Sequence, residues 1–515
     1  MLKDSLSFKN NFFYLSLFII FIFFLYASNS YRFIYDGHHH GLVFSNALDI
    51  LNGKKPYKEI FIQYGLVTTF LHSLVIKIFG YKIIYINIFT SFIYSLSIIL
   101  FYVIVDKLTN KKLAFCTVLI LLFNHPIIWL PWSNYISFFF IIFSVFHLVR
   151  TKSDNNFISG IFLSLCCLSR QDFFIPIFLS LLIFIFMHFY FNKKFLHRIV
   201  LGFIFPLLLF FMYLIFNDLL LDWSKTLYLP SLYLEDRETT LLSLLNNFLF
   251  FIFFDSFFNF INHPQNFIIS IIFLVNLFLL YFFFLSRKIR YFYLSFLSLS
   301  LCYTSINFET FRLYTSVSLG LIPAIFFIYK YKKNEYVKAL LYGFILISFF
   351  SIIFYPKGNN DFFYKDLNTL EKTNIGILEY VYLPKQTASS FKKIVKIKKD
   401  IDKNCLITYG ENFTFDTMII SLLNYNRIYY FPYVKIDTKS TKMMNFFDKK
   451  FVGKINNQIK NEKIILITEE NNTIFTFGKI NFGSNYTYTK ININSSNNKP
   501  KYLKFYYPKK CLPRS

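Results

Sequence analysis

The stretch that decides the fold is Asn266–Leu285, NFIISIIFLVNLFLLYFFFL, a continuous run without a charged side chain. About 20 apolar helical residues cross the hydrocarbon core of a bilayer, so this run has the length and composition of a membrane span. The loop that follows, Ser286–Arg290, has three basic residues. Short basic loops of this kind are typical of the cytoplasmic side of a membrane protein. The stretch therefore predicts one span whose carboxyl end lies in the cytoplasm.

The composition extends this prediction to most of the chain. Of 515 residues, 74 are Phe and 55% are hydrophobic, which is more apolar surface than one soluble core can bury. Apolar runs recur at 11–28, 82–105, 113–123, 135–149, 156–168, 173–190, 199–216, 266–285, 291–306, 313–329 and 339–355. From Pro356 onward the sequence is polar. We therefore expect a polytopic α-helical membrane domain over 1–355 and a second domain over 356–515.

Two further apolar runs, 65–79 and 244–261, either span the membrane or lie at its interface. If both stay on the outer face, the cytoplasmic loops contain 17 Lys and Arg residues and the outer loops 10. If both span, the division is 14 to 13. Because cytoplasmic loops are enriched in Lys and Arg, the first arrangement is preferred. It predicts about eleven spans, interfacial helices, and an extracytoplasmic carboxyl-terminal domain.

The carboxyl-terminal region alternates β-rich runs such as Cys405–Tyr409 and Lys463–Thr468 with a helical stretch near Asp416–Leu423. This pattern predicts a small α/β domain. Cys405 and Cys511 are the two cysteines of the region, so one disulfide between them is an expectation that spacing alone does not establish.

The net charge of +26 does not indicate a nucleic-acid partner. Half of the 54 basic residues lie in the membrane part, clustered in the short loops between apolar runs, where they mark topology. The other half give the region after Tyr355 a net charge of +14. A basic domain suits anionic lipid or acidic glycan, although a solvated surface is the simpler interpretation.

Acidic residues of the membrane part lie mostly on the predicted outer face. That side has eleven of them: Asp36, Asp49, Glu59, Asp172, Asp218, Asp222, Glu235, Asp236, Glu238, Asp255 and Glu309. The cytoplasmic side has four. Carboxylates for acid–base chemistry are therefore expected at the outer face.

The first outer loop begins with Tyr35-Asp36-Gly37-His38-His39-His40-Gly41 and ends with Pro56-Tyr57-Lys58-Glu59-Ile60-Phe61-Ile62-Gln63-Tyr64-Gly65. Asp36 directly follows the first span, where a carboxylate can reach a substrate whose lipid tail stays in the bilayer. A carboxylate that takes or orients the proton of an acceptor hydroxyl contributes typically about 10²–10⁴-fold in rate. The alternative is structural, with Asp36 as the N-cap of a helix that begins near His38.

This loop resembles that of the GT-C superfamily of membrane glycosyltransferases, and within it the bacterial family-39-like enzymes related to protein mannosyltransferases and the lipid A aminoarabinose transferase. The resemblance covers roughly residues 10–355 in architecture and 36–65 in motif. It implies a polyprenyl-phosphate sugar donor, an external active site and a catalytic Asp36. Where relatives have a second acid beside the first, this chain has Gly37, and Glu59 is the candidate replacement. Tyr64-Gly65-Leu66 stands where the family commonly has Tyr-Gly-Pro.

Arg170 and Arg312 are the candidate ligands of the donor phosphate. Both lie at turns on the outer side, where the positive-inside rule makes arginine scarce. The planar guanidinium suits phosphate because it forms bidentate hydrogen bonds. The alternative is that Arg170 pairs with Asp172, and Arg312 with Glu309, to hold the turns.

The three consecutive histidines raise the question of a metal ion. Neighbouring residues of a helix point about 100° apart, so all three do not face one ion. One or two of them, with Asp36 or Glu59, would form a divalent-metal site, whereas hydrogen bonding to sugar or phosphate needs no such set. The residues that we expect to bind substrate are His38, His39, His40, Gln63, Tyr64, Asp172 and Glu309.

The leading hypothesis is therefore transfer of a sugar from a polyprenyl-phosphate donor to a glycolipid, glycan or protein of a bacterial cell envelope, at the outer face of the cytoplasmic membrane. A transporter or flippase is one alternative, but such proteins place ionisable groups near the bilayer midplane. Here the span interiors have only occasional polar groups, such as His147, His188 and Asn276. A glycan polymerase or ligase and a non-catalytic scaffold are further alternatives. The sequence does not name the sugar, the acceptor or the oligomeric state.

Overall fold

The computed structural model describes most of residues 2–511. Outside the described residues lie 1, 31, 33–36, 61, 63, 125–130, 152, 194, 228–239, 261–262, 303–309, 332–334, 336–338, 340–341, 351–366, 401–405, 408–460, 462–463, 470–485, 495–499 and 512–515. The predicted domain boundary after residue 355 falls in one of these gaps.

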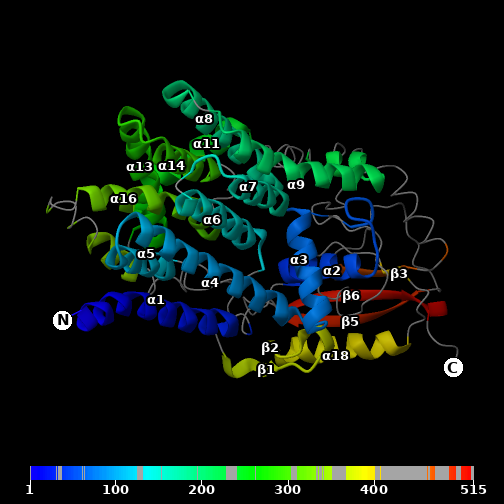
Figure 1. The fold of residues 1–515 in the computed structure, drawn as a ribbon. Helices are drawn as coiled ribbons and strands as arrows, with labels where there is room; N and C mark the ends of the chain where they lie inside the picture. The colour runs from blue at the N-terminus through cyan, green and yellow to red at the C-terminus, as the bar shows by residue number, and fades with distance from the viewer. Residues whose placement is uncertain are drawn as a thin grey trace.

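The amino-terminal region is a helical bundle (Figure 1). Seven helical segments of the described part are long and apolar enough to cross a membrane: Asn11–Asn29 in α1 (Leu2–Ser30), α4 (Ile83–Leu108), α6 (Ser133–Thr151), Gln171–Asn192 in η2 (Gln171–Phe173) and α8 (Phe174–Asn192), α9 (His197–Phe216), α13 (Pro264–Leu285), and Arg312–Lys330 in α15 (Thr310–Val317), η4 (Ser318–Gly320) and α16 (Leu321–Lys330). The polytopic membrane architecture predicted from composition is confirmed.

Other predicted spans are helical but short. The helices are α5 (Lys111–Asn124), α7 (Phe157–Ser169) and α14 (Ile289–Cys302), with 14, 13 and 14 residues. A full crossing needs about 20 residues, so these helices do not by themselves establish a span. The predicted run 339–355 is described only in part. The total of eleven spans stays a prediction.

The two ambiguous runs also form helices. One is α3 (Leu66–Phe79), and the other comprises α11 (Leu241–Phe250), the π-helical η3 (Phe251–Asp255) and α12 (Ser256–Phe258). In α3 the polar Thr68 and Ser73 are buried, while the apolar Leu74 and Ile78 are exposed. A helix surrounded by water would have the reverse arrangement. The orientation of α3 therefore fits an apolar environment such as the membrane interface.

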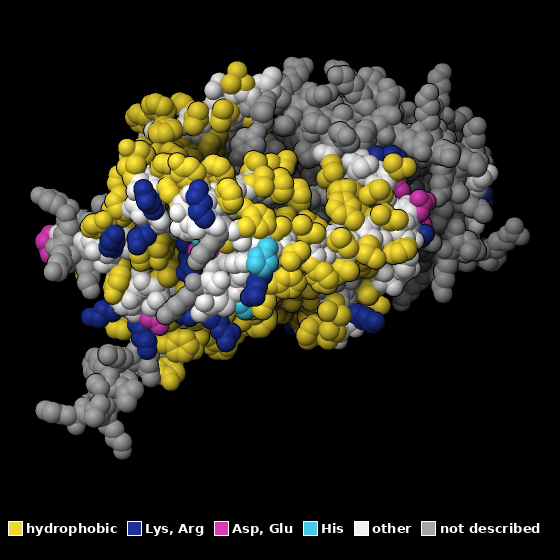
Figure 2. Space-filling model, turned by 45° about the horizontal axis from the view of Figure 1, so that its top comes forward, with side chains coloured by type: hydrophobic (Ala, Val, Ile, Leu, Met, Phe, Trp, Pro, Cys, Tyr) yellow, Lys and Arg dark blue, Asp and Glu magenta, His cyan; other side chains and the backbone are white. Residues whose placement is uncertain are grey.

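The exterior of the bundle is largely apolar. Among the described residues, Figure 2 shows hydrophobic side chains over much of the face in view, with Lys and Arg gathered mainly toward the end where Figure 1 places the amino terminus. Phe216 of α9 is 80% exposed, and Ile215 is 62% exposed. Such surface is stable only if hydrocarbon rather than water surrounds it.

Helices α7 and α9 cross at two glycines. A Cβ atom on Gly160 would overlap the carbonyl of Ile199, and one on Gly202 would overlap the carbonyl of Phe157. Small residues at such crossings let helix backbones approach closely, which is how membrane helices gain packing energy.

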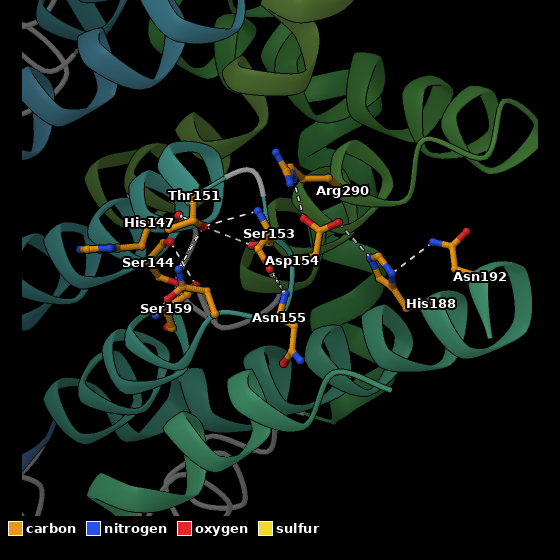
Figure 3. Close-up of polar contacts among 11 residues, drawn as sticks. Ser144, His147, Thr151, Ser153, Asp154, Asn155, Ser159, His188, Asn192 and Arg290 are labelled. Atoms are coloured by element: carbon orange, nitrogen blue, oxygen red, sulfur yellow. Dashed lines mark hydrogen bonds and ion pairs between the residues drawn. The ribbon is translucent and has the colours of Figure 1, made fainter. Parts of the chain in front are cut away.

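The α6–α7 loop ties several helix ends together (Figure 3). The Asp154 carboxylate accepts a 2.6 Å hydrogen bond from Nε of Arg290 on α14, and it lies 3.2 Å from Nε2 of His188 on α8. Burial alone would raise the pKa of Asp154, but the His188 hydrogen bond and the Arg290 charge outweigh it and lower that pKa. Asn155 accepts from the backbone N–H groups that open α9, and Asn156 caps α7. Asp154, Asn155 and Asn156 belong to a loop predicted to be cytoplasmic, and His188 contacts that loop from α8.

The described carboxyl-terminal elements combine strands with a helix. They are the antiparallel pair β1 (Leu370–Lys372) and β2 (Tyr382–Pro384), the short η6 (Gly376–Leu378), α18 (Lys385–Asp400), and a four-stranded sheet in the order β3-β4-β6-β5. Strand β3 (Leu406–Ile407) is parallel to β4 (Ile464–Glu469), while β6 (Pro500–Pro508) is antiparallel to both β4 and β5 (Tyr486–Asn494).

Two of the predicted strands coincide with β3 and β4. The predicted helix near Asp416–Leu423 lies outside the described residues. Cys511 is disulfide-bonded, and Cys116, Cys166, Cys167 and Cys302 are free. Cys405 lies in one of the gaps.

An ion pair joins this carboxyl-terminal region to the membrane part. Lys82, at the amino-terminal end of α4, lies 2.7 Å from the Glu379 carboxylate and 4.8 Å from the centre of the Tyr380 ring. The hydrogen bond to Glu379 raises the pKa of Lys82, and the same bond lowers the pKa of Glu379. Because water still reaches both half-buried groups, the contact directs docking more than it stabilises it.

We expect Gly202→Leu to destabilise the bundle, because its side chain would meet the backbone of α7. Overpacking of this kind costs about 1–3 kcal/mol. Thermal unfolding of the detergent-solubilised protein measures the effect. Gly343→Leu is the matched control, since a Cβ atom there has nothing within 4 Å. Equal melting temperatures for Gly202→Leu and wild type would contradict the close crossing.

Candidate functional site

The described part of the predicted site is centred on Tyr64. The Arg170 guanidinium lies 5.8 Å from the centre of the Tyr64 ring, and Arg312 Nη2 donates a 3.5 Å hydrogen bond to the Tyr64 hydroxyl. The edge of the Tyr64 ring meets Trp132 at 5.1 Å between centroids, and the Arg312 guanidinium lies 4.5 Å above the Trp132 ring. Arg170 and Arg312, which were predicted separately from the sequence, are thus brought together around Tyr64, itself a predicted site residue.

The backbone around Tyr64 is held against the end of α7. The Gln171 N–H donates a 2.7 Å hydrogen bond to the Tyr64 carbonyl, and Thr68 Oγ1 donates a 3.0 Å bond to the Ser169 carbonyl. A Cβ atom on Gly65 would overlap the Ser169 backbone. Steric constraints therefore explain the glycine after Tyr64, because only glycine allows the start of α3 to approach α7 this closely.

Arg170 is buried and paired, with 1% of its surface exposed. Its Nε donates to Asp172 Oδ1 at 2.7 Å and its Nη2 donates to Asp172 Oδ2 at 2.6 Å, while Nη1 donates to Asn134. The guanidinium also lies 4.8 Å from the Phe173 ring. This geometry is that of the structural alternative, in which Arg170 and Asp172 hold their own turn. Direct phosphate binding by Arg170 stays a prediction.

Arg312 has a different environment. It lies in the first turn of α15, is half-buried, and its guanidinium rests on the Trp132 ring. Its backbone carbonyl accepts from Thr315 Oγ1 and Ser316 Oγ, which fixes the start of the helix. The Glu309 side chain, its alternative partner, lies outside the described residues. Because Arg312 is the less buried of the two predicted arginines, a ligand reaches it more readily.

Helix α2 (Gly37–Leu51) begins at the residue after Asp36. Asp36 lies outside the described residues, as do the side chains of His38 and His39. His40 is buried, and its Nε2 lies 2.9 Å from Nδ2 of Asn87 on α4. The start of α2 is thereby attached to α4 on the predicted outer side of the bundle.

Glu59 closes a tight turn. Its Oε2 accepts a 2.7 Å hydrogen bond from the Lys55 N–H, and the side chain is exposed. Inside the turn, Tyr57 adopts a φ of 65°, an uncommon conformation for a residue with a side chain. Burial raises the pKa of the Tyr57 phenol, and the nearby Tyr213 raises it further. The proposed second-acid role of Glu59 stays a prediction.

Gln63, like Asp36 and Glu309, lies in a gap. Within the described part of the chain, no three His, Cys, Asp or Glu side chains gather closely enough to hold a metal ion. The metal site considered in the sequence analysis, with Asp36 as one of its acids, stays a prediction.

Trp132 and Asn134 are site residues that sequence reasoning missed. Trp132 is one of only three tryptophans, and both residues stand at the predicted outer end of α6, on the same side as the turn that contains Arg170. A polar residue at the start of a span, such as Asn134, could have been recognised in the sequence as a candidate site residue. That it binds Arg170, 36 residues away, is seen only in the folded structure.

Comparisons with known proteins identify the fold. No protein-family model and no curated protein sequence matches the chain. The oligosaccharyltransferase of Archaeoglobus fulgidus, solved with zinc and sulfate, superposes with a TM-score of 0.53 at 10% identity, over 88% of this chain and 68% of its own. The same enzyme tethered to an acceptor peptide gives 0.50 at 11% identity, over 88% and 69%.

ArnT from Cupriavidus metallidurans, in the apo state, aligns over 99% of this chain and 100% of its own, at 8% identity and a TM-score of 0.46. At these identities the likeness concerns the fold alone. The chain has a fold like that of the Archaeoglobus fulgidus oligosaccharyltransferase, so the fold-level resemblance drawn in the sequence analysis is confirmed.

We expect Arg170→Gln to lower the stability of the protein. The change breaks the salt bridge to Asp172 and leaves the side-chain amide oxygen of Asn134 without its hydrogen-bond donor. Losing such buried, charge-assisted hydrogen bonds costs about 1–3 kcal/mol. The melting temperature in detergent measures the loss. Arg150→Gln, on the exposed end of α6, serves as the matched control. An unchanged melting temperature for Arg170→Gln would show that the buried pair is not structural.

Proposed function

We propose that this protein is a membrane glycosyltransferase that moves a sugar from a polyprenyl-phosphate donor to an acceptor of the cell envelope. The observation that carries the proposal is the meeting of Tyr64, Arg170 and Arg312 in a GT-C-type fold. Two arginines and two aromatic rings gather at the predicted outer ends of the helices, where a lipid-borne anion would arrive.

The proposed chemistry is a direct displacement at the anomeric carbon of the donor. The acceptor oxygen forms a bond to that carbon while the bond to the phosphate oxygen breaks, and the polyprenyl phosphate leaves with the electron pair. Asp36 takes or orients the proton of the acceptor hydroxyl. Arg312 donates hydrogen bonds to the phosphate oxygens as their negative charge increases, which stabilises the transition state more than the ground state.

Arg170 has a supporting role in this proposal. Asp172 and Asn134 fix the guanidinium of Arg170 by hydrogen bonds, and the Tyr64 ring packs against this fixed group. Tyr64 in turn contacts the guanidinium of Arg312. Positioning of this kind supports catalysis because misplacement by about 1 Å can reduce the rate on the order of 10²-fold.

The environment of the site suits a lipid-borne donor. The outward face of α3, directly after Gly65, exposes Phe70, Leu74 and Ile78. A polyprenyl chain in the outer leaflet would lie against such a face while its phosphate reached the arginines. The hydrophobic donor also gives a physical reason for a catalyst that is itself embedded in the membrane.

The three span-interior polar groups noted in the sequence analysis have structural partners, which weighs against transport. Asn276 donates hydrogen bonds to the carbonyls of Ile272 and Gly320, His188 contacts Asp154, and His147 stacks on Phe162. A transporter would instead direct such groups at a substrate near the midplane.

We expect Asp36→Asn to abolish sugar transfer while leaving the protein folded. The experiment compares a strain lacking this protein with strains that carry wild type or the variant, and mass spectrometry profiles their surface glycans, glycolipids and polyprenyl-phosphate sugars. Loss of about 10²–10⁴-fold in activity is the size expected for a positioned base.

The control is equal expression and equal melting temperature of the two proteins. If wild type restores a sugar-bearing product and Asp36→Asn does not, the missing mass names the sugar. If the variant restores every product, Asp36 is only a helix cap, and the transporter and scaffold alternatives become the better explanations.

We expect Arg312→Gln to reduce kcat/KM for the donor by about 10²–10³-fold, because the leaving phosphate loses a charged hydrogen-bond donor. Its melting temperature should stay close to that of wild type, in contrast to Arg170→Gln. Arg312→Lys keeps the charge but loses the planar fork, so an intermediate activity is expected. Transfer assays with purified protein and a synthetic short-chain donor measure both. Wild-type kinetics for Arg312→Gln would remove Arg312 from the site.

A further inference from the structure

Cations and aromatic rings gather where two membrane spans end, at the end of α8 that is remote from the candidate site. The Lys193 ammonium lies 6.0 Å from the centre of the Tyr190 ring, and that ring meets Phe191 at 5.0 Å between centroids. The Arg287 guanidinium, which follows α13, lies 5.5 Å from the same Phe191 ring. Phe191 also lies 6.1 Å from Phe284 of α13. We name these five residues the basic aromatic cluster.

The backbone fixes both cations directly after the last turn of a span. Lys193 has a φ of 54° and Arg287 a φ of 53°, a conformation that is uncommon for residues other than glycine. Their N–H groups donate to the carbonyls of Phe189 at 3.0 Å and Phe284 at 3.1 Å, which closes the helix ends. Both side chains are exposed. When α8 and α13 cross a bilayer, these cations therefore lie at the level of the lipid headgroups.

The two cations have aromatic partners and, within the described part of the chain, no acidic partner. Helices α8, α9, α13 and α14 contain no Asp or Glu. The acid that contacts these helices is Asp154, and its carboxylate is already held by Arg290 and His188. The charge of the cluster is therefore not cancelled by its own helices or by the loop beside them.

Two other described acids belong to this end of the bundle, and both lie elsewhere. Asp106, on α4, interacts with Lys111 of α5. Glu335 has an interaction of its own and follows α16, whose end packs on Phe282 through Tyr331. Phe282 is two residues from the ring of α13 that joins the cluster, so the two rings point about 200° apart around the helix. Glu335 thus follows a segment packed on the opposite side of α13.

We propose that the basic aromatic cluster binds the headgroup of an anionic phospholipid. The planar fork of Arg287 suits two oxygens of the phosphate, and Lys193 supplies a second positive charge. The acyl chains would lie against exposed rings further into the two spans, such as Phe186 and Tyr281, which are 62% and 67% exposed. A zwitterionic lipid brings a cationic group that Lys193 and Arg287 repel, so the cluster selects a lipid with net negative charge.

The simpler explanation is that each cation only offsets the dipole of the helix that it follows. A positive charge after the carboxyl end of a helix is stabilising, and both Lys193 and Arg287 are so placed. This effect does not explain why Arg287, which follows α13, rests on the Phe191 ring of α8. An aromatic ring orients a guanidinium without cancelling its charge, which leaves the charge available to a ligand. The inference goes beyond the proposed function and is independent of it, because lipid binding needs neither donor nor transfer.

The test titrates the purified full-length protein in detergent with phosphatidylglycerol, or with phosphatidylcholine of the same acyl chains, and measures the tightest lipid binding by native mass spectrometry. The variants are Lys193→Gln/Arg287→Gln and Phe191→Leu. The matched control is Lys112→Gln/Arg150→Gln, which removes two exposed cations from α5 and α6. Inorganic phosphate at constant ionic strength competes as the free anion. A second measurement compares melting temperatures in phosphatidylcholine nanodiscs with and without phosphatidylglycerol.

We expect Lys193→Gln/Arg287→Gln to weaken phosphatidylglycerol binding by about tenfold or more, because two cations at headgroup level are lost. Phe191→Leu should weaken it several-fold, since the ring no longer orients the guanidinium. The control should bind like wild type, and phosphatidylcholine should bind more weakly. Phosphatidylglycerol should raise the melting temperature of the wild type, and the double variant should lose this gain.

Four results would overturn the proposal. Equal loss in the Lys112→Gln/Arg150→Gln control would mean that the lipid responds to diffuse positive charge. Equally tight phosphatidylcholine binding would remove the selectivity, and full displacement by inorganic phosphate would assign the cluster to a free anion. A double variant that melts lower by the same amount with and without phosphatidylglycerol, and binds it like wild type, would leave the helix dipole as the explanation.

Discussion

The predicted outer end of the bundle depends on how one buried cation is neutralised. A guanidinium taken out of water is tolerated only if carboxylate and amide groups replace its hydration. For Arg170 those groups are Asp172, two residues further along the chain, and Asn134, at the start of another helix. The pairing therefore fixes the end of α7 relative to the start of α6. Tyr64 lies on this fixed base, and the contacts of Tyr64 with Trp132 and Arg312 bring the first outer loop and α15 to the same place. The geometry of the candidate site follows from that one requirement.

The two ends of the bundle place their charges in different ways. At the end predicted to be cytoplasmic, Asp154 contacts Arg290 and His188, and Asn155 caps α9, so that short-range contacts hold the helix ends. The other end combines the buried Arg170 pair with Arg312, a half-buried arginine that rests on an aromatic ring. An aromatic ring attracts a cation without cancelling its charge. The guanidinium of Arg312 is thus partly accessible, and the proposed function uses it to bind the donor phosphate.

The membrane class and the grouping of Tyr64, Arg170 and Arg312 at one end of the bundle were predictable, because both follow from short-range patterns in the sequence. Apolar runs mark helices, and counting Lys and Arg assigns the loops to a side, so the sequence alone assigned Tyr64, Arg170 and Arg312 to one face. The pairing of Arg170 with Asp172 was also visible as an alternative, since the two are neighbours in sequence. The contacts of Asn134 and Trp132 were not, because they join residues that are far apart in the sequence and meet only in the folded bundle. The number of membrane spans could not be fixed from the sequence for a related reason. Helices α5, α7 and α14 are so short that their length alone does not decide whether they cross the membrane.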